Sequence, residues 1–527
     1  YLRAAGVQAG DRVVAFLPNI PEASIAFMAA CSIGAVWSSC SPDFGASSVV
    51  DRFQQIEPKI IFAVDGYQYN GKAYDKKAIV ADIIELLPSV EQVVFVPYLD
   101  TNATLTSSRS VITWTAIMAS PVTPLSFERV SFDHPLWVLY SSGTTGKPKA
   151  ITHGHGGALL EHYKYLAFHN DVHLGERFFW YSTTGWMMWN YVQAALLAGA
   201  TIVLYDGSPS FPNLNVLWEL AEQAGIHHFG TSAPFLVACM KKDLAIHKDQ
   251  NLAPLRSISS TGAPLPPEAF DYIYEKIKED LWLVSMSGGT DVCTAFVGGN
   301  PILPVYEGHI QCRALGCALE AWDEDGLSVE NEVGEMVITK PMPSMPIYFW
   351  NDPDDLRYLT SYFAKYEGVW RHGDWVKITP RKSLIIYGRS DATLNRQGIR
   401  IGTAEIYRSV NKIAAIADSL VVNLELSGGR HYMPLFVVLN ESKPLTETIS
   451  AQIKGQLRAD YTPRHVPDDI VVCPEIPYTI SGKKLEAPVK KILLGIPTGK
   501  AANKDAMRNP WSLDFFIDFA KELKETL

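Results

Sequence analysis

The sequence predicts an α/β fold: a large N-terminal domain of parallel-type βαβ units with further β pieces, followed by a smaller, mobile α+β domain. Two patterns predict it. Short β-branched runs alternate with helical periods through the first half of the chain, and a different arrangement of strands and helices follows residue 389. The chain length of 527 residues also exceeds what one hydrophobic core supports, so at least two domains are expected.

The elements of the large domain are predicted from runs such as RVVAFLP and KIIFAVD, which are rich in β-branched residues, and from longer stretches of helical period between them. Strands followed by helices are typical of βαβ units, in which the strands lie parallel. In order, we expect strand 12–18, helix 21–37, strand 59–65, strand 136–142, helix 156–168, strand 201–206, helix 215–225 and strand 256–261.

The pattern changes toward the C-terminus. The runs 334–340, 368–379 and 382–389 read as antiparallel β pieces separated by turns. Two helix–strand alternations follow and predict the smaller α+β domain: 404–416 with 419–426, and 447–461 with 469–477. We therefore predict domains at 1–390 and 391–527. Because the chain lacks a starting Met, we expect the large domain to be incomplete at its N-terminus.

The composition predicts a soluble globular protein, with 47% hydrophobic and 19% charged residues. A formal charge of −10 argues against nucleic acid as a partner. The longest apolar stretch, AALLAGATIVLY, is far shorter than the roughly 20 residues that a membrane span needs, and no signal pattern opens the chain. The seven cysteines include no CxxC pair, so we expect buried thiols and a cytoplasmic protein.

The stretch YSSGTTGKPKA, residues 140–150, indicates a phosphate-binding loop, because small residues leave backbone N–H groups accessible and a lysine adds positive charge. It is neither a Walker A loop nor a Rossmann loop, since its glycines are spaced differently and Pro148 follows Lys147. An ordinary surface turn is the alternative reading. The candidate phosphate-binding residues are Ser141, Ser142, Gly143, Thr144, Thr145, Gly146 and Lys149.

Five further motifs occur after this loop in the chain and help to interpret it. They are TGAP at 261–264, SGGTD at 287–291, RHGDW at 371–375, GRSDATLNRQGIRIGTAEI at 388–406 and PYTISGKK at 477–484. With the glycine loop, and in this order, the motifs resemble those of the acyl-adenylate-forming enzymes, the superfamily of acyl-CoA synthetases, luciferases and peptide-synthetase adenylation domains. KAITHGHGG, STTGWMMWN, PMPSMPIYFWNDPD and RNPWSLDFF further resemble the acetoacetate–CoA ligases within it, which carry about a hundred further N-terminal residues.

The resemblance implies a two-step reaction that uses ATP, Mg²⁺ and coenzyme A. A carboxylate attacks the α-phosphate of ATP, and the thiol of coenzyme A then displaces AMP. The matching positions make Lys483 the catalytic lysine, Asp374 the ribose ligand and Arg389 a phosphate ligand. Thr290 would contact the α-phosphate, and Asp291 would bind Mg²⁺ at a position where the family more often has Glu.

The remaining motif residues are assigned in the same way. Gly262, Ala263 and Pro264 match the segment beside the adenine. Asp391 matches the hinge about which the small domain rotates between the two steps. Gly398 matches the channel for the pantetheine arm of coenzyme A, and Arg400 a contact to AMP or phosphate.

The acyl pocket is predicted at Gly288, where acetyl-CoA synthetases carry a tryptophan. A glycine there would open the volume of a side chain for extra carbons. Met187 and Met188 would line the opposite wall, with ordinary core packing as the alternative. Thr261 and Asn190 are the candidate donors to the 3-keto oxygen of acetoacetate.

The sequence thus predicts an ATP-dependent acid–CoA ligase for acetoacetate that acts on small-molecule substrates only. The alternatives are a ligase for another short or medium-chain acid, an adenylation enzyme that loads a carrier protein, and a nucleotide-binding protein without catalysis. The histidine pairs 153/155 and 227/228 have no third metal ligand in view, so we expect all four residues to be structural.

Overall fold

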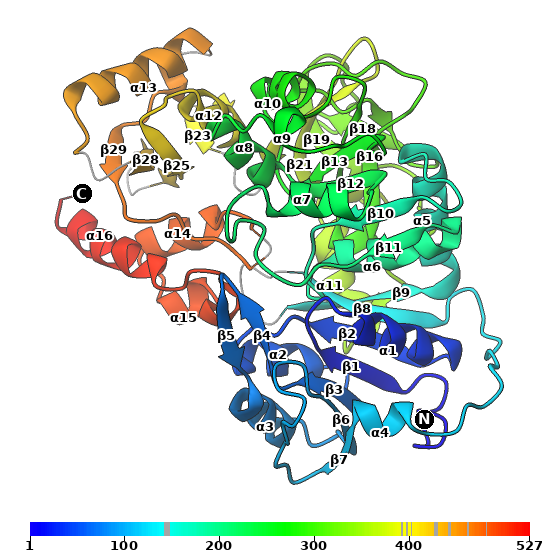
Figure 1. The fold of residues 1–527 in the computed structure, drawn as a ribbon. Coiled ribbons are helices and arrows are strands. Elements are labelled where there is room, and N and C mark those ends of the chain that lie inside the picture. The colour runs from blue at the N-terminus through cyan, green and yellow to red at the C-terminus, as the bar shows by residue number, and fades with distance from the viewer. Residues whose placement is uncertain are drawn as a thin grey trace. The chain divides into compact units, whose positions relative to one another are not determined.

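The computed structural model describes residues 1–141, 148–390, 394–396, 399–401, 403–425, 431–440, 444–460, 463–480 and 482–526 (Figure 1). These residues form two compact units. The first comprises the described residues within 1–318 and 339–369, and the second those within 319–338 and 370–526.

The first unit contains an eight-stranded sheet in the order β20-β9-β8-β2-β1-β3-β6-β7. The six neighbouring strands from β8 to β7 are parallel to one another. Strand β9 pairs antiparallel with β8, and β20 pairs antiparallel with β9. Helix α1 (Pro21–Ser32) packs its alanines and Phe27 against one face and buries Trp37. The strands are β1 (Arg12–Phe16), β2 (Val36–Cys40), β3 (Ile60–Val64), β6 (Gln92–Val96), β7 (Ser110–Thr113), β8 (Pro135–Ser141), β9 (Lys149–Gly154) and β20 (Tyr348–Phe349).

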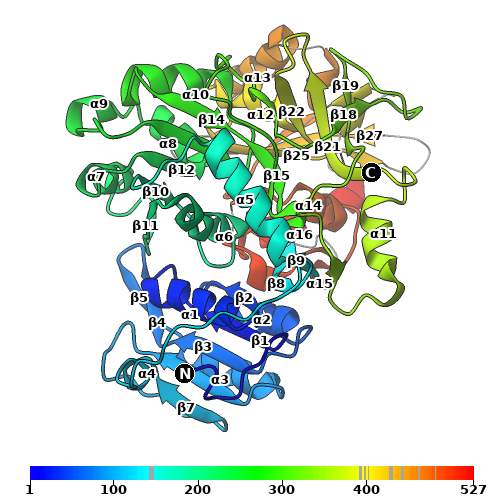
Figure 2. The same cartoon turned by 90° about the vertical axis from the view of Figure 1, so that its right-hand side faces the viewer.

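A second sheet of the same unit is parallel throughout, in the order β11 (Thr201–Val203), β10 (Arg177–Trp180), β12 (His228–Ser232), β13 (Ser257–Thr261) and β14 (Trp282–Ser285). Alternate side chains face opposite sides. Phe179 and Phe229 pack with α7 (Val216–Gln223), α8 (Ala233–Lys241) and α10 (Pro267–Tyr272). Phe178 and Trp180 contact Tyr191 of α6 (Met187–Ala194), which neighbours α5 (His155–His169) (Figure 2).

Shorter elements complete the first unit. Strands β15 (Ser287–Gly289), β16 (Thr294–Gly298) and β17 (Cys312–Arg313) form a small antiparallel sheet, with the 3₁₀ turn η3 (Thr290–Val292) between the first two. The others are α2 (Ala46–Phe53), β4 (Gly66–Tyr69), β5 (Lys72–Asp75), α3 (Lys77–Leu86), α4 (Trp114–Met118), η1 (Ala195–Ala198), α9 (Ile246–Asp249), η2 (Ile273–Ile277), η4 (Pro353–Asp355) and α11 (Leu356–Tyr362).

The second unit holds an antiparallel sheet of β18 (Leu319–Trp322), β19 (Val333–Ile338), β21 (Trp370–Ile378) and β22 (Leu384–Arg389). It also holds a sheet of β25 (Ile416–Val421), β28 (Pro434–Leu439) and β29 (Asp469–Val472). Leu435 and Val437 face α12 (Thr403–Asn411) and α13 (Glu447–Asp460), whereas Phe436 faces α14 (Glu486–Leu493) and α16 (Ser512–Thr526). The remaining elements are β23 (Leu394–Arg396), β24 (Ile399–Ile401), β26 (Leu424–Glu425), β27 (His431–Tyr432), η6 (Pro463–His465), α15 (Thr498–Ala501) and η7 (Lys504–Ala506).

The predicted α/β fold class is confirmed, with one clear error among the elements. The predicted helix 21–37 ends at Ser32, and its last residues belong to β2. Gly34 ends the helix by adopting φ +72, a conformation that glycine tolerates without strain. Across the described residues, every helix is too short or too polar to cross a membrane, and all seven cysteines are free thiols.

Candidate active site

The adenine segment predicted at 262–264 lies at the carboxyl edge of the five-stranded sheet, directly after β13. Gly262 has φ +88, and the space where its Cβ would lie is open. Ala263 and Pro264 are exposed. Ligands of parallel α/β sheets bind outside the carboxyl ends of the strands, so this edge is a suitable place for a nucleotide.

Lys149 and Asp291, two sequence-predicted residues far apart in the chain, lie together. The Lys149 Nζ is 4.0 Å from the Asp291 Oδ1, and both side chains are partly exposed. The hydroxyl of Tyr362, at the end of α11, donates a hydrogen bond to the same carboxylate oxygen. The Lys149 Nζ also lies 5.0 Å from the ring centroid of Tyr362, so one aromatic residue contacts both charges. Sequence reasoning missed Tyr362, because nothing in LRYLTSY distinguishes it from a core tyrosine.

Asp291 and Thr290 belong to the 3₁₀ turn η3. Two histidines form hydrogen bonds to backbone carbonyl oxygens in and directly after this turn. The Nε2 of His153 is 2.9 Å from the Asp291 carbonyl oxygen, and the Nε2 of His162 is 2.6 Å from the Cys293 carbonyl oxygen. Burial lowers the pKa of each histidine to about 4, so both are neutral at physiological pH. The structural role expected for His153 agrees with these contacts.

The residues that flank the glycine loop on either side are hydrogen-bonded to the segment around α2. The Tyr140 hydroxyl donates to the Arg52 carbonyl oxygen at 2.9 Å, and the Gln55 Nε2 donates to the Pro148 carbonyl oxygen at 3.1 Å. The Oγ of Ser141 is buried and has no hydrogen-bond partner among the described residues. The predicted residues Ser142, Gly143, Thr144, Thr145, Gly146, Asp391 and Gly398 lie outside the described residues.

The acyl-pocket prediction at Gly288 needs correction. A Cβ on Gly288 would lie 2.0 Å from the Thr294 carbonyl oxygen and 2.5 Å from the Ala295 Cα. The missing side chain therefore allows β15 and β16 to approach each other, and its place is taken by backbone rather than by an open volume. In this backbone, glycine is required for packing.

The other acyl-pocket candidates differ in their surroundings. Met188 is buried, and Met187 packs against the core of the eight-stranded sheet, as the packing alternative predicted. The Thr261 hydroxyl donates to the Met286 carbonyl oxygen at 3.1 Å, so its proton is already used. The Asn190 Nδ2 is buried without a hydrogen-bond acceptor in the described part of the chain, which makes it a better candidate donor than Thr261.

In the second unit, Asp374 and Arg389 face each other across β21 and β22. The Arg389 Nη1 is 3.8 Å from the Asp374 Oδ1, and the His372 Nε2 is 3.5 Å from its Oδ2. Asp374 is buried, whereas half of the Arg389 side chain is exposed. Gly373 has φ +89 and leaves space for the Arg389 guanidinium. This pair offers a fixed carboxylate and an accessible guanidinium side by side.

The two lysines of the SGKK motif have distinct surroundings. Lys483 is exposed on a turn in which its N–H donates to the Thr479 Oγ1 and its carbonyl oxygen accepts from the Thr479 N–H. The Lys484 Nζ instead lies 2.7 Å from Asp418 and 4.1 Å above the Tyr407 ring. Lys484 is therefore a structural residue, and Lys483 is the one presented to solvent. Arg400 lies in β24, paired with Asn395 of β23.

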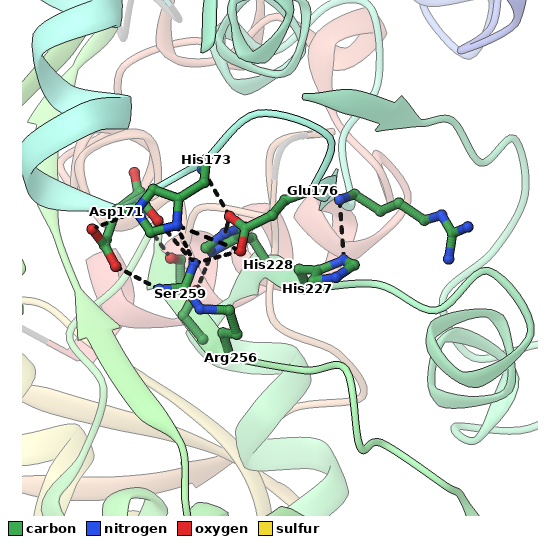
Figure 3. Close-up of polar contacts among 10 residues, drawn as sticks. Asp171, His173, Glu176, His227, His228, Arg256 and Ser259 are labelled. Carbon is green, nitrogen blue, oxygen red and sulfur yellow. Dashed lines mark hydrogen bonds and ion pairs between the residues drawn. The ribbon is translucent and has the colours of Figure 1, made fainter. Parts of the chain in front are cut away.

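A different polar cluster occupies the opposite, amino edge of the five-stranded sheet (Figure 3). Arg256 bonds Asp171 at 2.5 Å and Glu176 at 2.6 Å, and the His228 Nε2 is 2.7 Å from Glu176. Burial alone would raise the pKa of Glu176, but hydrogen bonds from His228, from the His173 N–H and from Arg256 lower it to about 2. A cavity of about 180 Å³ opens beside Asp171, His228, Arg256, Ser257, Trp282 and Pro301. Asp171, Glu176, His228 and Arg256 each have a partner within the cluster, and these contacts link the segment before β10 to the starts of β12 and β13.

The donor set for a metal ion is small. No group of three or more His, Cys, Asp or Glu side chains suited to a metal occurs within the described ranges. The carboxylate of Asp291 is the one predicted ligand. Mg²⁺ commonly uses one or two carboxylates, with waters and substrate phosphates completing its coordination, so a single aspartate fits a Mg²⁺ that arrives with ATP.

Comparison with known proteins identifies the class to which the fold and its motifs belong. The chain belongs to the AMP-binding enzyme family, whose model matches residues 1–349. It is 45% identical to acetoacetyl-coenzyme A synthetase of Rhizobium meliloti, over 99% of this chain and 80% of that protein. It is 42% identical to acetoacetyl-CoA synthetase of Gallus gallus, over 98% and 78%. The solved structure of acetoacetyl-CoA synthetase from Streptomyces lividans is 48% identical with a TM-score of 0.93, over 99% and 79%.

Proposed function

We propose that this protein is an ATP-dependent acetoacetate–CoA ligase that releases AMP and pyrophosphate. The observation that carries the proposal is its identity of 42 to 48% with proteins named as acetoacetyl-CoA synthetases, over 98 to 99% of the chain. The approach of the Lys149 ammonium and the Tyr362 hydroxyl to the partly exposed Asp291 carboxylate supports it.

The first step joins the acetoacetate carboxylate to the α-phosphorus of ATP and breaks the α–β phosphate bridge, which releases pyrophosphate. Anion attacks anion, so positive charge must be supplied at the phosphates. Lys149, the glycine loop and the buried Ser141 hydroxyl would hold the β- and γ-phosphates. Thr290 would contact the α-phosphate. Asp291 would bind Mg²⁺, which would supply further neutralisation of the phosphate charge.

The motif residues of the second unit have proposed roles of their own. Asp374 would accept hydrogen bonds from both ribose hydroxyls, and Arg389 would bind phosphate with its planar guanidinium. Lys483 would bridge the carboxylate and the α-phosphate, a role that its exposure supports. Arg400 would contact AMP or phosphate.

The second step forms the thioester and expels AMP. We propose that domains 1–390 and 391–527 reorient about Asp391 between the two steps, so that Gly398 leaves room for the pantetheine arm. We further propose a cytoplasmic location, which the free thiols of all seven cysteines support.

The experiment is pyrophosphate release with ATP, Mg²⁺ and coenzyme A, offering acetate, butyrate and acetoacetate in parallel. We expect a strong preference for acetoacetate and a loss of about 10²–10³-fold in Lys483→Ala, the effect of removing one group that stabilises transition-state charge. Lys490→Ala, which removes one positive charge from the same segment, is the matched control and should keep full activity. Equal turnover of butyrate would replace acetoacetate by a broader acid class. Full activity in Lys483→Ala would reject the lysine assignment.

A further inference from the structure

His153 has one defined proton position, set by its two hydrogen bonds. The Trp137 Nε1–H donates to the His153 Nδ1 at 3.1 Å, and an indole can only donate. The Nδ1 therefore accepts, and the proton of the neutral ring lies on Nε2. That Nε2–H donates to the carbonyl oxygen of Asp291 at 2.9 Å. Trp137 and His153 are buried, so no solvent competes for these bonds.

Two side chains of strand β9 contact Asp291. Lys149 and His153 are four residues apart in β9, so their side chains lie on the same face of the strand. The Lys149 ammonium lies 4.0 Å from the Asp291 carboxylate, and the His153 ring binds the Asp291 carbonyl. One strand thus contacts both the side chain and the backbone of the candidate Mg²⁺ ligand.

The far end of the η3 turn is held in a similar way. Cys293 adopts φ +44, an uncommon backbone conformation for a residue with a side chain. Its carbonyl oxygen is 2.6 Å from the His162 Nε2, and the His162 ring lies 5.6 Å from the Trp137 ring. Trp137 therefore contacts both histidines, and the two histidines bind carbonyl oxygens on either side of Val292.

We propose that His153 is a positioning residue for the Mg²⁺–ATP site: through its Nε2–H it fixes the backbone of Asp291 and so aims the Asp291 carboxylate. The proposal rests on the proposed role of Asp291. Groups that orient a metal ligand through a hydrogen bond typically change metal affinity or activity 10–100-fold when they are removed. Both ring nitrogens of His153 are bonded within the protein, so its effect would be transmitted through Asp291.

The test compares His153→Leu, which lacks a donor, with His153→Gln, whose Nε2 amide can donate near the position of the histidine Nε2. Two quantities are measured: the Mg²⁺ concentration for half-maximal pyrophosphate release, and calorimetric binding of Mg²⁺ with α,β-methylene ATP, which is not cleaved at that bridge. We expect His153→Leu to weaken both at least 10-fold and His153→Gln to restore them to within about threefold.

His169→Leu is the matched control. His169 is also buried and bonds backbone groups at Gly299 and Leu315, at 2.7 and 3.0 Å, away from η3. It should lower thermal stability without changing the Mg²⁺ dependence. Asp291→Asn tests the proposed role of Asp291 as the Mg²⁺ ligand. If Asp291→Asn weakens Mg²⁺ binding but His153→Leu does not, the positioning role is overturned and the ligase assignment stands. If Asp291→Asn has no effect, the metal role of Asp291 and the inference both fail.

A spectroscopic readout covers the case in which His153→Leu does not fold. In protein labelled with ¹⁵N-histidine, the His153 signal is identified by its absence in His153→Gln, and two-bond ¹H–¹⁵N couplings report which ring nitrogen carries the proton. We expect the Nε2–H tautomer, shifted in Trp137→Phe, which removes the donor to Nδ1. A proton on Nδ1 in the unaltered protein would overturn the proposal.

Discussion

Glu176→Gln is expected to destabilise the first unit, because it removes the charge at the centre of the Arg256 cluster. Glu176 is bonded by Arg256 and His228, and its side chain is only 13% exposed, so solvent screens these interactions weakly. Its loss leaves Arg256 with Asp171 as its remaining acidic partner in the cluster. The cluster joins the segment before β10 to the first residues of β12 and β13, so the change should weaken the amino edge of the sheet.

The magnitude follows from the pKa of Glu176, which falls from an ordinary value of 4.5 to about 2 in the fold. At about 1.4 kcal/mol for each pKa unit, and before any solvent screening, the charged form stabilises the native state by at most about 3 kcal/mol at neutral pH. Because the folded pKa is the lower one, this stabilisation is complete above about pH 5. It declines as the pH falls toward 2, with about 1 kcal/mol already lost at pH 4.

The assay is urea unfolding followed by tryptophan fluorescence at pH 7, 5 and 4 for the unaltered protein and Glu176→Gln. We expect a difference of up to about 3 kcal/mol at pH 7 and 5 that shrinks by about 1 kcal/mol at pH 4. Glu279→Gln, at an exposed site, is the control and should change little. A difference that is small at pH 7, or that grows as the pH falls, would refute the assignment of the cluster as a stabilising ion-pair network.

Two further predictions concern residues that the sequence assigned to the acyl pocket. Gly288→Ala should lower the free energy of unfolding by about 1–3 kcal/mol, since its Cβ would overlap the Thr294 carbonyl; Gly455→Ala, in α13 with open space around it, should not. An unchanged urea midpoint in Gly288→Ala would restore the open-pocket reading. Asn190→Leu should lower kcat/KM for acetoacetate about 10-fold relative to butyrate, if the buried Nδ2 donates to the 3-keto oxygen. An equal change for both acids would instead indicate a packing defect.

Much of the fold could be predicted because its signals are local. The runs around β1, β3, β8 and β13 are short and β-branched, and helical periods follow them, so strand, helix and parallel order were predictable. The helix that starts at Pro21 was predicted too long, because SIGAVW continues the apolar pattern across the turn. Only the backbone conformation of Gly34 separates helix from strand there.

The residues of the site were predicted one at a time, but the contacts between them could not be predicted from the sequence. Lys149 and Asp291 were each found from their own motifs, but their 4.0 Å approach depends on how β9 lies beside η3. The sequence around Tyr362 and around His153 contains no pattern that predicts which residues they contact. Gly288 was misread because a glycine in a motif can mean an absent side chain or a close backbone, and only the position of Thr294 decides between them.

The two polar groups at opposite edges of the five-stranded sheet show which physical feature separates a structural cluster from a candidate site. At the amino edge, Arg256 is bonded by two carboxylates and His228 by Glu176 and Ser257, so the donors and acceptors satisfy one another. At the carboxyl edge, the Gly262 segment is exposed, and the space beside Gly262 is open. Ligands of parallel α/β sheets bind outside the carboxyl ends of the strands. Self-satisfied charges at one edge and an exposed, open segment at the other therefore favour nucleotide binding at the carboxyl edge, even though the amino edge carries more charge.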